Sequence, residues 1–182
     1  MAQEKPSGIA FFDFDKTIIT VDSGPRYGWH IYKDRVAGAL PSFRALFYGI
    51  GFKMGLVKRR SVAKFGVAAY KGIPRDVLTK WMKEAYPRLI QPHLSKTVVD
   101  RMKQHQAEGF HVVVISASPP FFLQEAADDL GMDAVFGSEL GFENEVCTGK
   151  YTGKYLAGPV KADIARDYAA AQGLTLDDCY FY

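Results

Sequence analysis

Two aspartates lie close together near the start of the sequence, in the stretch FFDFDKT at residues 11–17. Residues two apart in an extended segment point the same way, so the carboxylates of Asp13 and Asp15 could face one ligand. Two carboxylates this close are stable only when a cation lies between them or when they share one proton. Hard oxygen ligands of this kind suit Mg²⁺. The simpler alternative is that Asp15 only caps a turn.

Two later segments carry groups that could bind an anion. In ISASPPFF, residues 115–122, Ser118 is predicted to be the N-cap of a helix with Pro119 at its first position. That arrangement would present free backbone N–H groups and the positive end of a helix dipole, and Ser116 would add a hydroxyl donor. Lys161 is expected in the first turn of another helix, where a cation is unfavourable unless an anion lies nearby.

Each of these groups has a purely structural alternative, namely a helix start for the serines and a solvent-pointing side chain for the lysine. Taken together, acids that can bind a cation, an anion-binding helix start and a lysine describe a phosphate site.

Strands and helices alternate along most of the sequence, and this alternation is predicted to bring the candidate residues together. The pattern predicts strands at 9–14, 111–115, 134–136 and 179–182, helices at 95–109, 121–130 and 160–172, and a hairpin excursion at 139–156. Such an order is typical of an α/β fold with a doubly wound (Rossmann-like) parallel sheet. Ligands of these sheets collect beyond the carboxyl ends of the strands, where Asp13, Asp15 and Ser116 would lie.

The segment 23–90 shows helical spacing, for example at Trp81 and Ala85, and no strand alternation. We therefore expect an α-helical cap at 23–90, inserted in a core formed by 1–22 and 91–182. The apolar stretch 36–58 within it is interpreted as a buried cap helix, with an interfacial amphipathic helix as the alternative.

The predicted cap is strongly basic, with 14 Lys and Arg, three acids and eleven aromatic residues. This composition indicates an anionic partner such as a phosphate, a lipid headgroup or a nucleic acid, although a solvated basic helical face would account for it too. No aromatic-rich RNA motif or zinc-finger spacing supports nucleic-acid binding, which we do not expect.

The remaining composition is that of an ordinary globular protein, at 48% hydrophobic and 24% charged residues. Cys147 and Cys179 are the only cysteines, too few for a disulfide framework or a cysteine-based metal site. The start MAQEKPSG leads straight into the first strand, so no secretory signal is expected. We expect a cytoplasmic location, or a peripheral position at the inner membrane surface if the cap binds anionic lipid.

The order of these features resembles the haloacid dehalogenase-like (HAD) phosphohydrolase superfamily, whose first three motifs correspond to FFDFDKT, VVVISAS and GPVK. The helical insertion between the first two motifs is similar to the cap of the phosphoserine-phosphatase-like branch, subfamily IB.

The resemblance implies a Mg²⁺-dependent phosphomonoester hydrolase. Asp13 would be the nucleophile that forms an aspartyl-phosphate, Asp15 the general acid and then the general base, and Lys161 the cation that neutralises charge. Mg²⁺ would be bound by the Asp13 carboxylate and the Asp15 backbone carbonyl. The groups expected to bind the substrate phosphate are Thr17, Ser116, the Ala117 N–H and Ser118.

The substrate implied by the basic, aromatic cap is a small or lipid-linked phosphomonoester. Two alternatives stay open, a non-catalytic or fragment protein that binds phosphate or a partner, and a cap that binds an anionic membrane surface.

The family's fourth motif is an acidic pair just after the fourth strand that completes the Mg²⁺ site, and the sequence stops at DDCYFY where this motif should begin. Asp177 and Asp178 precede that strand, so at about 3.3 Å per residue they would lie about 13 Å too far away. We therefore expect a fragment with weakened Mg²⁺ binding.

We predict that this chain alone has little phosphatase activity and that a version extended past Tyr182 has much more, because the extension would supply the missing acidic ligands. The measurement is Mg²⁺-dependent turnover of a generic phosphomonoester by both versions. Equal turnover would contradict the prediction.

Overall fold

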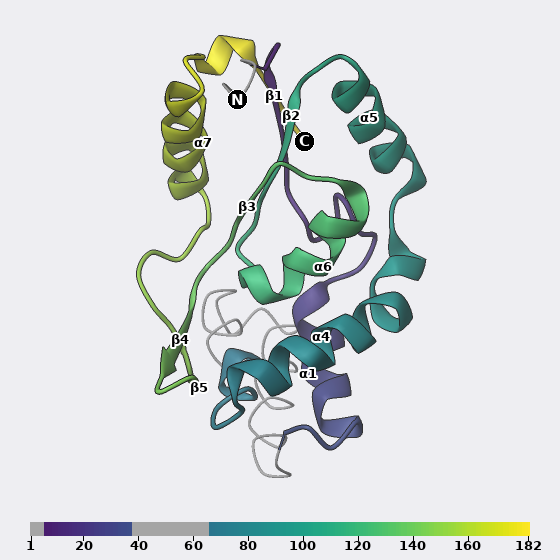
Figure 1. Ribbon diagram of the computed structural model, residues 1–182, viewed down its shortest axis with the longest axis vertical. Coiled ribbons are helices and arrows are strands. Elements are labelled where there is room, and N and C mark those ends of the chain that lie inside the picture. Colours follow the sequence, from purple (N-terminus) through teal and green to yellow (C-terminus); the bar gives the residue numbers. More distant parts are fainter. Residues whose placement is uncertain (1–5, 38–65) are drawn as a thin grey trace, which may run out of the picture.

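The computed structural model describes residues 6–37 and 66–182. At its centre is a four-stranded sheet in the order β3-β2-β1-β6, in which every neighbouring pair is parallel (Figure 1). Its strands are β1 (Ile9–Phe12), β2 (His111–Ile115), β3 (Ala134–Phe136) and β6 (Cys179–Phe181). The predicted hairpin is formed by the antiparallel strands β4 (Leu140–Glu143) and β5 (Val146–Tyr151).

Helices cover both faces of this sheet. On one face, Met102 of α5 (Lys96–Ala107) and Leu123 of α6 (Pro120–Leu130) join a buried cluster with alternate strand residues such as Phe12 and Val114. On the other face, Ala165 of α7 (Pro159–Ala171) packs in a second cluster with the strand residues of opposite orientation. The predicted doubly wound α/β fold is therefore confirmed.

The buried strands explain the apolar runs of the sequence. Every residue of β1 is 0–2% exposed, because its side chains alternate between the two covered faces. The segment HVVVI forms β2 with the predicted bounds, as its run of β-branched residues favours. Two short 3₁₀ helices, η1 (Gln91–His93) and η2 (Leu176–Asp178), lead into α5 and β6.

The described part of the predicted cap contains the helices α1 (Ser23–Lys33) and α4 (Arg75–Leu89), which lie at the end of the molecule toward which the strands' carboxyl ends point (Figure 1). Trp81 and Ala85, whose spacing predicted a helix, are both buried in α4. Asp34, the C-cap of α1, accepts hydrogen bonds from Trp81 Nε1 at 2.9 Å and Arg88 Nη2 at 2.7 Å. These contacts fix the two helices to each other.

The same helices also pack against the core. Leu78 and Trp81 of α4 and Tyr27 of α1 belong to the buried cluster that includes Phe12 of the sheet. The Tyr86 hydroxyl of α4 donates a hydrogen bond of 2.6 Å to Asp129 of α6. The division into a core and a cap at 23–90 stays a prediction, since the described helices share one apolar cluster with the sheet.

A backbone connection that the sequence pattern did not indicate ties the cap to the β4–β5 hairpin. The Gly72 N–H donates to the Cys147 carbonyl at 2.8 Å, and the Cys147 N–H donates to the Ile73 carbonyl at 2.9 Å. Arg75 continues this pairing through its N–H to the Glu145 carbonyl at 2.8 Å, and its Nε lies 2.6 Å from Glu145 Oε2. Its guanidinium also stacks over the Phe142 ring at 3.8 Å from the centroid.

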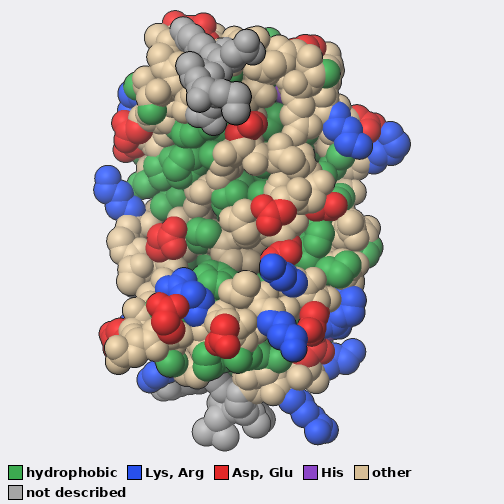
Figure 2. All heavy atoms as spheres, viewed as in Figure 1, with side chains coloured by type: hydrophobic (Ala, Val, Ile, Leu, Met, Phe, Trp, Pro, Cys, Tyr) green, Lys and Arg blue, Asp and Glu red, His purple; other side chains and the backbone are tan. Residues whose placement is uncertain are grey.

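Several predictions about the cap fall outside the described residues. Only Val36 and Ala37 of the apolar stretch 36–58 are described, and six of the 14 basic residues lie within 38–65. Acidic and basic side chains are intermixed on the face drawn in Figure 2. Across residues 6–37 and 66–182, none of the helices has the length and apolar character needed to cross a membrane.

A buried histidine links α5 to the end of β6. The side chain of His105 is 3% exposed, and its Nε2 lies 2.9 Å from the Tyr182 hydroxyl. Its Nδ1 has no hydrogen-bond partner in the described part of the chain, with Glu108 Oε2 at 3.8 Å. Burial lowers the pKa of His105 below its ordinary value of 6.5, and Glu108 opposes this effect only in part.

We predict that His105 makes the protein less stable as the pH falls below about 6.5, the pKa of an unfolded histidine. The unfolded chain takes up a proton there and the buried ring does not, so the free energy of unfolding decreases with falling pH. Urea unfolding between pH 7.5 and about 5 should show a shallower pH slope for His105→Gln than for the wild type. Parallel pH curves for the two proteins would rule out this contribution.

Candidate active site

Asp13 follows β1 directly and lies at the carboxyl edge of the sheet. Its backbone N–H donates to the Tyr182 carbonyl at 3.0 Å, which extends the β1–β6 pairing by one step. Its Oδ1 accepts a hydrogen bond of 2.7 Å from the Phe14 N–H, and its Oδ2 lies 2.6 Å from Lys161 Nζ. The Asp13 side chain is 42% exposed, so it can be reached from solvent.

Lys161 is brought to Asp13 by the start of α7. Gly158, the N-cap residue, has φ +57°, a backbone conformation that favours glycine, and Lys161 N–H donates to its carbonyl at 3.1 Å. Lys161 therefore lies in the first turn, as predicted. The Asp13 carboxylate is the nearby anion that this otherwise unfavourable position required.

Asp15 has different partners from Asp13. Its Oδ1 accepts a hydrogen bond of 2.5 Å from the N–H of Ser23, the first residue of α1. Its Oδ2 accepts one of 2.7 Å from the Ser118 hydroxyl. Asp15 thus does act as a cap, but for a helix that begins eight residues later and not for a local turn. The Asp13 side chain therefore contacts α7, whereas the Asp15 side chain contacts α1 and the loop after β2.

The loop after β2 differs in one respect from the prediction. Ser118 is not the N-cap of α6, because the helix begins at Pro120 with Pro119 as its N-cap. The Ser118 hydroxyl is bonded to Asp15, and its N–H donates to Ser116 Oγ at 3.1 Å. The prolines have no N–H groups, so the helix start offers fewer free donors than we predicted.

The other predicted phosphate-binding groups lie around the same edge. Ser116 is 1% exposed, and its N–H donates to the Phe136 carbonyl of β3 at 2.9 Å. The Ala117 N–H has no acceptor among the described residues. Thr17 is half-buried in the turn after Asp15, and its N–H donates to the Phe14 carbonyl at 3.3 Å.

A comparison with protein families matches residues 10–182 to the haloacid dehalogenase-like hydrolases. The chain belongs to this family. The predicted membership of the HAD superfamily is confirmed, and the similar proteins below agree with its phosphoserine-phosphatase-like branch.

Two curated relatives and one solved structure illustrate the similarity. The inhibition of morphological differentiation protein of Streptomyces azureus is 25% identical over 97% of this chain and 65% of its own length. The phosphoserine phosphatase of Archaeoglobus fulgidus is 31% identical over 72% of this chain and 34% of its own length. The phospho-aspartyl intermediate analogue of phosphoserine phosphatase superposes with a TM-score of 0.68 and 19% identity, covering 97% of this chain and 78% of that one. This HAD chain therefore spans less than two thirds of the length of the two curated relatives.

The oxygen atoms of Asp13 and Asp15 in this HAD chain are of the chemical type that binds Mg²⁺. An ionised carboxylate has about four lone-pair positions, and the two contacts of Asp13 leave others for a cation. The Asp15 carbonyl would add a second hard oxygen, and Mg²⁺ usually keeps several waters beside one or two protein ligands. Within the described part of the chain, no three acidic, histidine or cysteine side chains gather closely enough to hold a metal by themselves.

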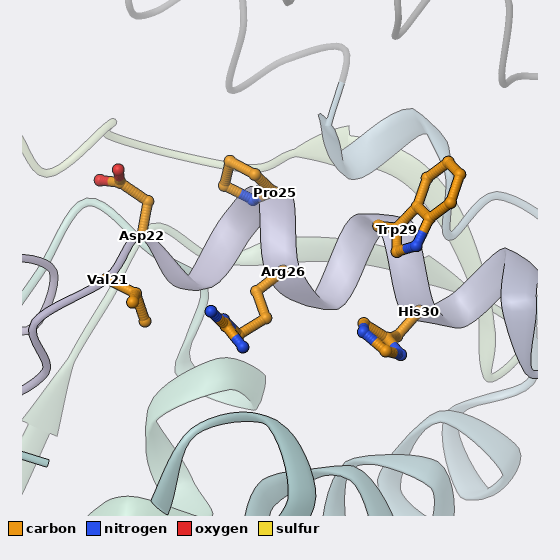
Figure 3. Close-up of a pocket in the computed structure, with 6 residues that line it drawn as sticks. All are labelled: Val21, Asp22, Pro25, Arg26, Trp29 and His30. Carbon is orange, nitrogen blue, oxygen red and sulfur yellow. The ribbon is translucent and has the colours of Figure 1, made fainter. Parts of the chain in front are cut away.

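A recess with a volume of about 430 Å³ lies along α1 (Figure 3). Its lining consists of Val21, Asp22, Pro25, Arg26, Trp29 and His30, and so includes none of the predicted site residues. Trp29 is 69% exposed. Val21 and Asp22 of this lining directly precede Ser23 in the sequence.

Ser23 is a site residue that sequence reasoning missed. It is fully buried, and both its N–H and its hydroxyl face the acid site. The only signal was a serine at the start of a predicted helical segment, which indicates a cap and gives no sign that a distant acid supplies the acceptor.

We predict that Lys161→Met changes the free energy of unfolding by less than about 1 kcal/mol, because partly exposed ion pairs contribute little to stability. Denaturant unfolding measures this, and Arg166→Met is the matched control, since Arg166 pairs with Asp163 on the same helix at 3.0 Å. A loss above about 2 kcal/mol for Lys161→Met alone would mean that the pair with Asp13 is mainly structural.

Proposed function

We propose that this HAD chain is a phosphatase that hydrolyses phosphomonoesters through an aspartyl-phosphate on Asp13. The observation that carries the proposal is the pairing of Asp13 with Lys161 at 2.6 Å at the carboxyl edge of the sheet, beside the loop that ends β2. A half-exposed carboxylate beside a cation can meet an anionic substrate there, since the lysine offsets the repulsion between them.

In the first step, Asp13 attacks phosphorus in line, an Asp13–phosphorus bond forms, and the bond from phosphorus to the leaving oxygen breaks. Asp15 gives its proton to that leaving oxygen, which departs as an alcohol. Lys161 stabilises the negative charge that gathers on the transferring phosphoryl group. When bound, Mg²⁺ would be held by the Asp13 carboxylate and the Asp15 carbonyl and would neutralise charge on the phosphoryl oxygens.

In the second step, a water molecule attacks phosphorus and gives its proton to Asp15, which was left ionised. The bond between Asp13 and phosphorus breaks, so that the carboxylate is restored and inorganic phosphate leaves. The groups that would bind the phosphoryl oxygens are the Thr17 hydroxyl, the Ser116 hydroxyl and the Ala117 N–H. The Ser118 hydroxyl was expected to join them, but its proton is directed at Asp15.

The proposed substrate is a small phosphomonoester whose leaving group lies under the cap at 23–90. The phosphoserine phosphatase named among the relatives supports this choice. A lipid-linked substrate, a peripheral membrane position and a cytoplasmic location stay predictions from composition, because much of the basic segment lies outside the described residues.

We predict that Asp13→Asn in the full-length protein lowers Mg²⁺-dependent phosphatase turnover by about 10³-fold or more, because the amide is not a nucleophile. Trapped covalent phosphate, measured after acid quenching, should disappear in parallel. Asp100→Asn is the control, since this exposed aspartate on α5 pairs only with Lys96 in the described structure. Retained turnover in Asp13→Asn would contradict the mechanism. A wild type that binds phosphate but shows no turnover would favour a non-catalytic phosphate-binding protein.

A further inference from the structure

The carboxylate of Asp15 is held by donors from two segments that are far apart in the sequence. The Ser23 N–H on α1 donates to Oδ1 at 2.5 Å, and the Ser118 hydroxyl after β2 donates to Oδ2 at 2.7 Å. The two serine hydroxyls lie 3.1 Å apart, which closes the arrangement. Ser23 is fully buried and Ser118 is 9% exposed, so water competes little for these bonds.

We propose that Ser23 and Ser118 are positioning residues that orient Asp15 for proton transfer, and that they make this orientation depend on where α1 lies. This inference rests on the proposed function, in which Asp15 protonates the leaving group.

When Asp15 is ionised, the Ser118 hydroxyl donates its one proton to Asp15 Oδ2. Ser118 can then only accept from Ser23, so the Ser23 hydroxyl is the donor in the contact between them. The Ser23 hydroxyl of α1 therefore donates to Ser118 in the loop after β2, and Ser118 donates to Asp15. Ser118 is thereby assigned to Asp15 and not to a phosphoryl oxygen.

The bond to Ser23 also explains how α1 begins. The first N–H groups of a helix have no partner within the helix, and they attract negative charge. Asp22, the N-cap residue of α1, makes no side-chain cap bond, and the Asp15 carboxylate takes its place. One hydrogen bond therefore serves both the start of the cap helix and the orientation of the acid.

The position of α1 is itself fixed by packing. Tyr27 and Ile31 are fully buried, and Asp34 binds Trp81 and Arg88 of α4. A shift of α1 would carry the Ser23 N–H away from Asp15. A misplacement of a catalytic group by about 1 Å can lower a rate by about 10²-fold. The position of α1 would therefore control the rate of proton transfer from Asp15.

The test compares Ser118→Ala, Ser23→Ala and Ser23→Pro in the full-length protein. Ser23→Ala removes the hydroxyl and keeps the N–H, whereas Ser23→Pro removes both. Proline is tolerated here, because Ser23 is the first residue of α1 and Asp22 before it is extended, with φ −95° and ψ 121°.

The readout is kcat/KM for an alkyl phosphate and for p-nitrophenyl phosphate, with Mg²⁺ present. An alkoxide leaves only when it is protonated, whereas p-nitrophenolate leaves without a proton. We expect Ser118→Ala and Ser23→Pro to lower the value for the alkyl phosphate by about 10- to 100-fold, and the value for the aryl phosphate by less than about threefold. Ser23→Ala should lie between Ser23→Pro and the wild type.

Ser95→Ala and Lys96→Pro are the matched controls, because Ser95 is an N-cap without a side-chain cap bond and Lys96 is the first residue of α5. Both should keep the wild-type ratio between the two substrates. Equal losses on both substrates, or no loss in Ser118→Ala and Ser23→Ala, would overturn the inference. A wild type that turns over neither substrate would instead overturn the proposed function, so the two failures are distinguishable. If Ser23→Pro does not fold by circular dichroism, the two alanine variants alone decide.

Discussion

Two carboxylates on one short turn, at the end of a buried strand, have to be balanced by groups from elsewhere in the chain. Asp13 is paired with Lys161 from α7, and Asp15 is bound by Ser23 from α1 and Ser118 from the loop after β2. Two carboxylates this close repel each other, so these contacts stabilise the turn. The helices α7 and α1 and the loop after β2 each place one donor at this edge of the sheet. These donors are Lys161, Ser23 and Ser118.

Each donor arrives because of packing at a distance. α7 lies on one face of the sheet through Ala165, and its glycine N-cap turns Lys161 toward Asp13. α1 is held through Tyr27 in the cluster on the other face. The cap is attached at a second place, where residues 72–75 pair with the β4–β5 hairpin. The cap therefore contacts the acid site through α1 and is also bonded to the β4–β5 hairpin.

Most of the elements could be predicted, because their signals are local. The run HVVVI is apolar and β-branched over its whole length and became β2 with the predicted bounds. The N-cap of α6 was predicted wrongly as Ser118, which is a good N-cap by type. Its hydroxyl is instead bonded to Asp15, 103 residues earlier in the chain. The pairing of residues 72–75 with β5 also escaped prediction, because backbone hydrogen bonds carry no side-chain pattern.

The sequence by itself determined the α/β class, the order of the elements and the identity of the chemical groups, since strand and helix periodicity and the motif spacing are properties of neighbouring residues. It also indicated that Lys161 needed an anion nearby. Only the tertiary structure decided that this anion is Asp13, and that Asp15 is bound by Ser23 and Ser118. Such contacts join residues whose distance in the sequence says nothing about their distance in space, and they form only when the two faces of the sheet are packed.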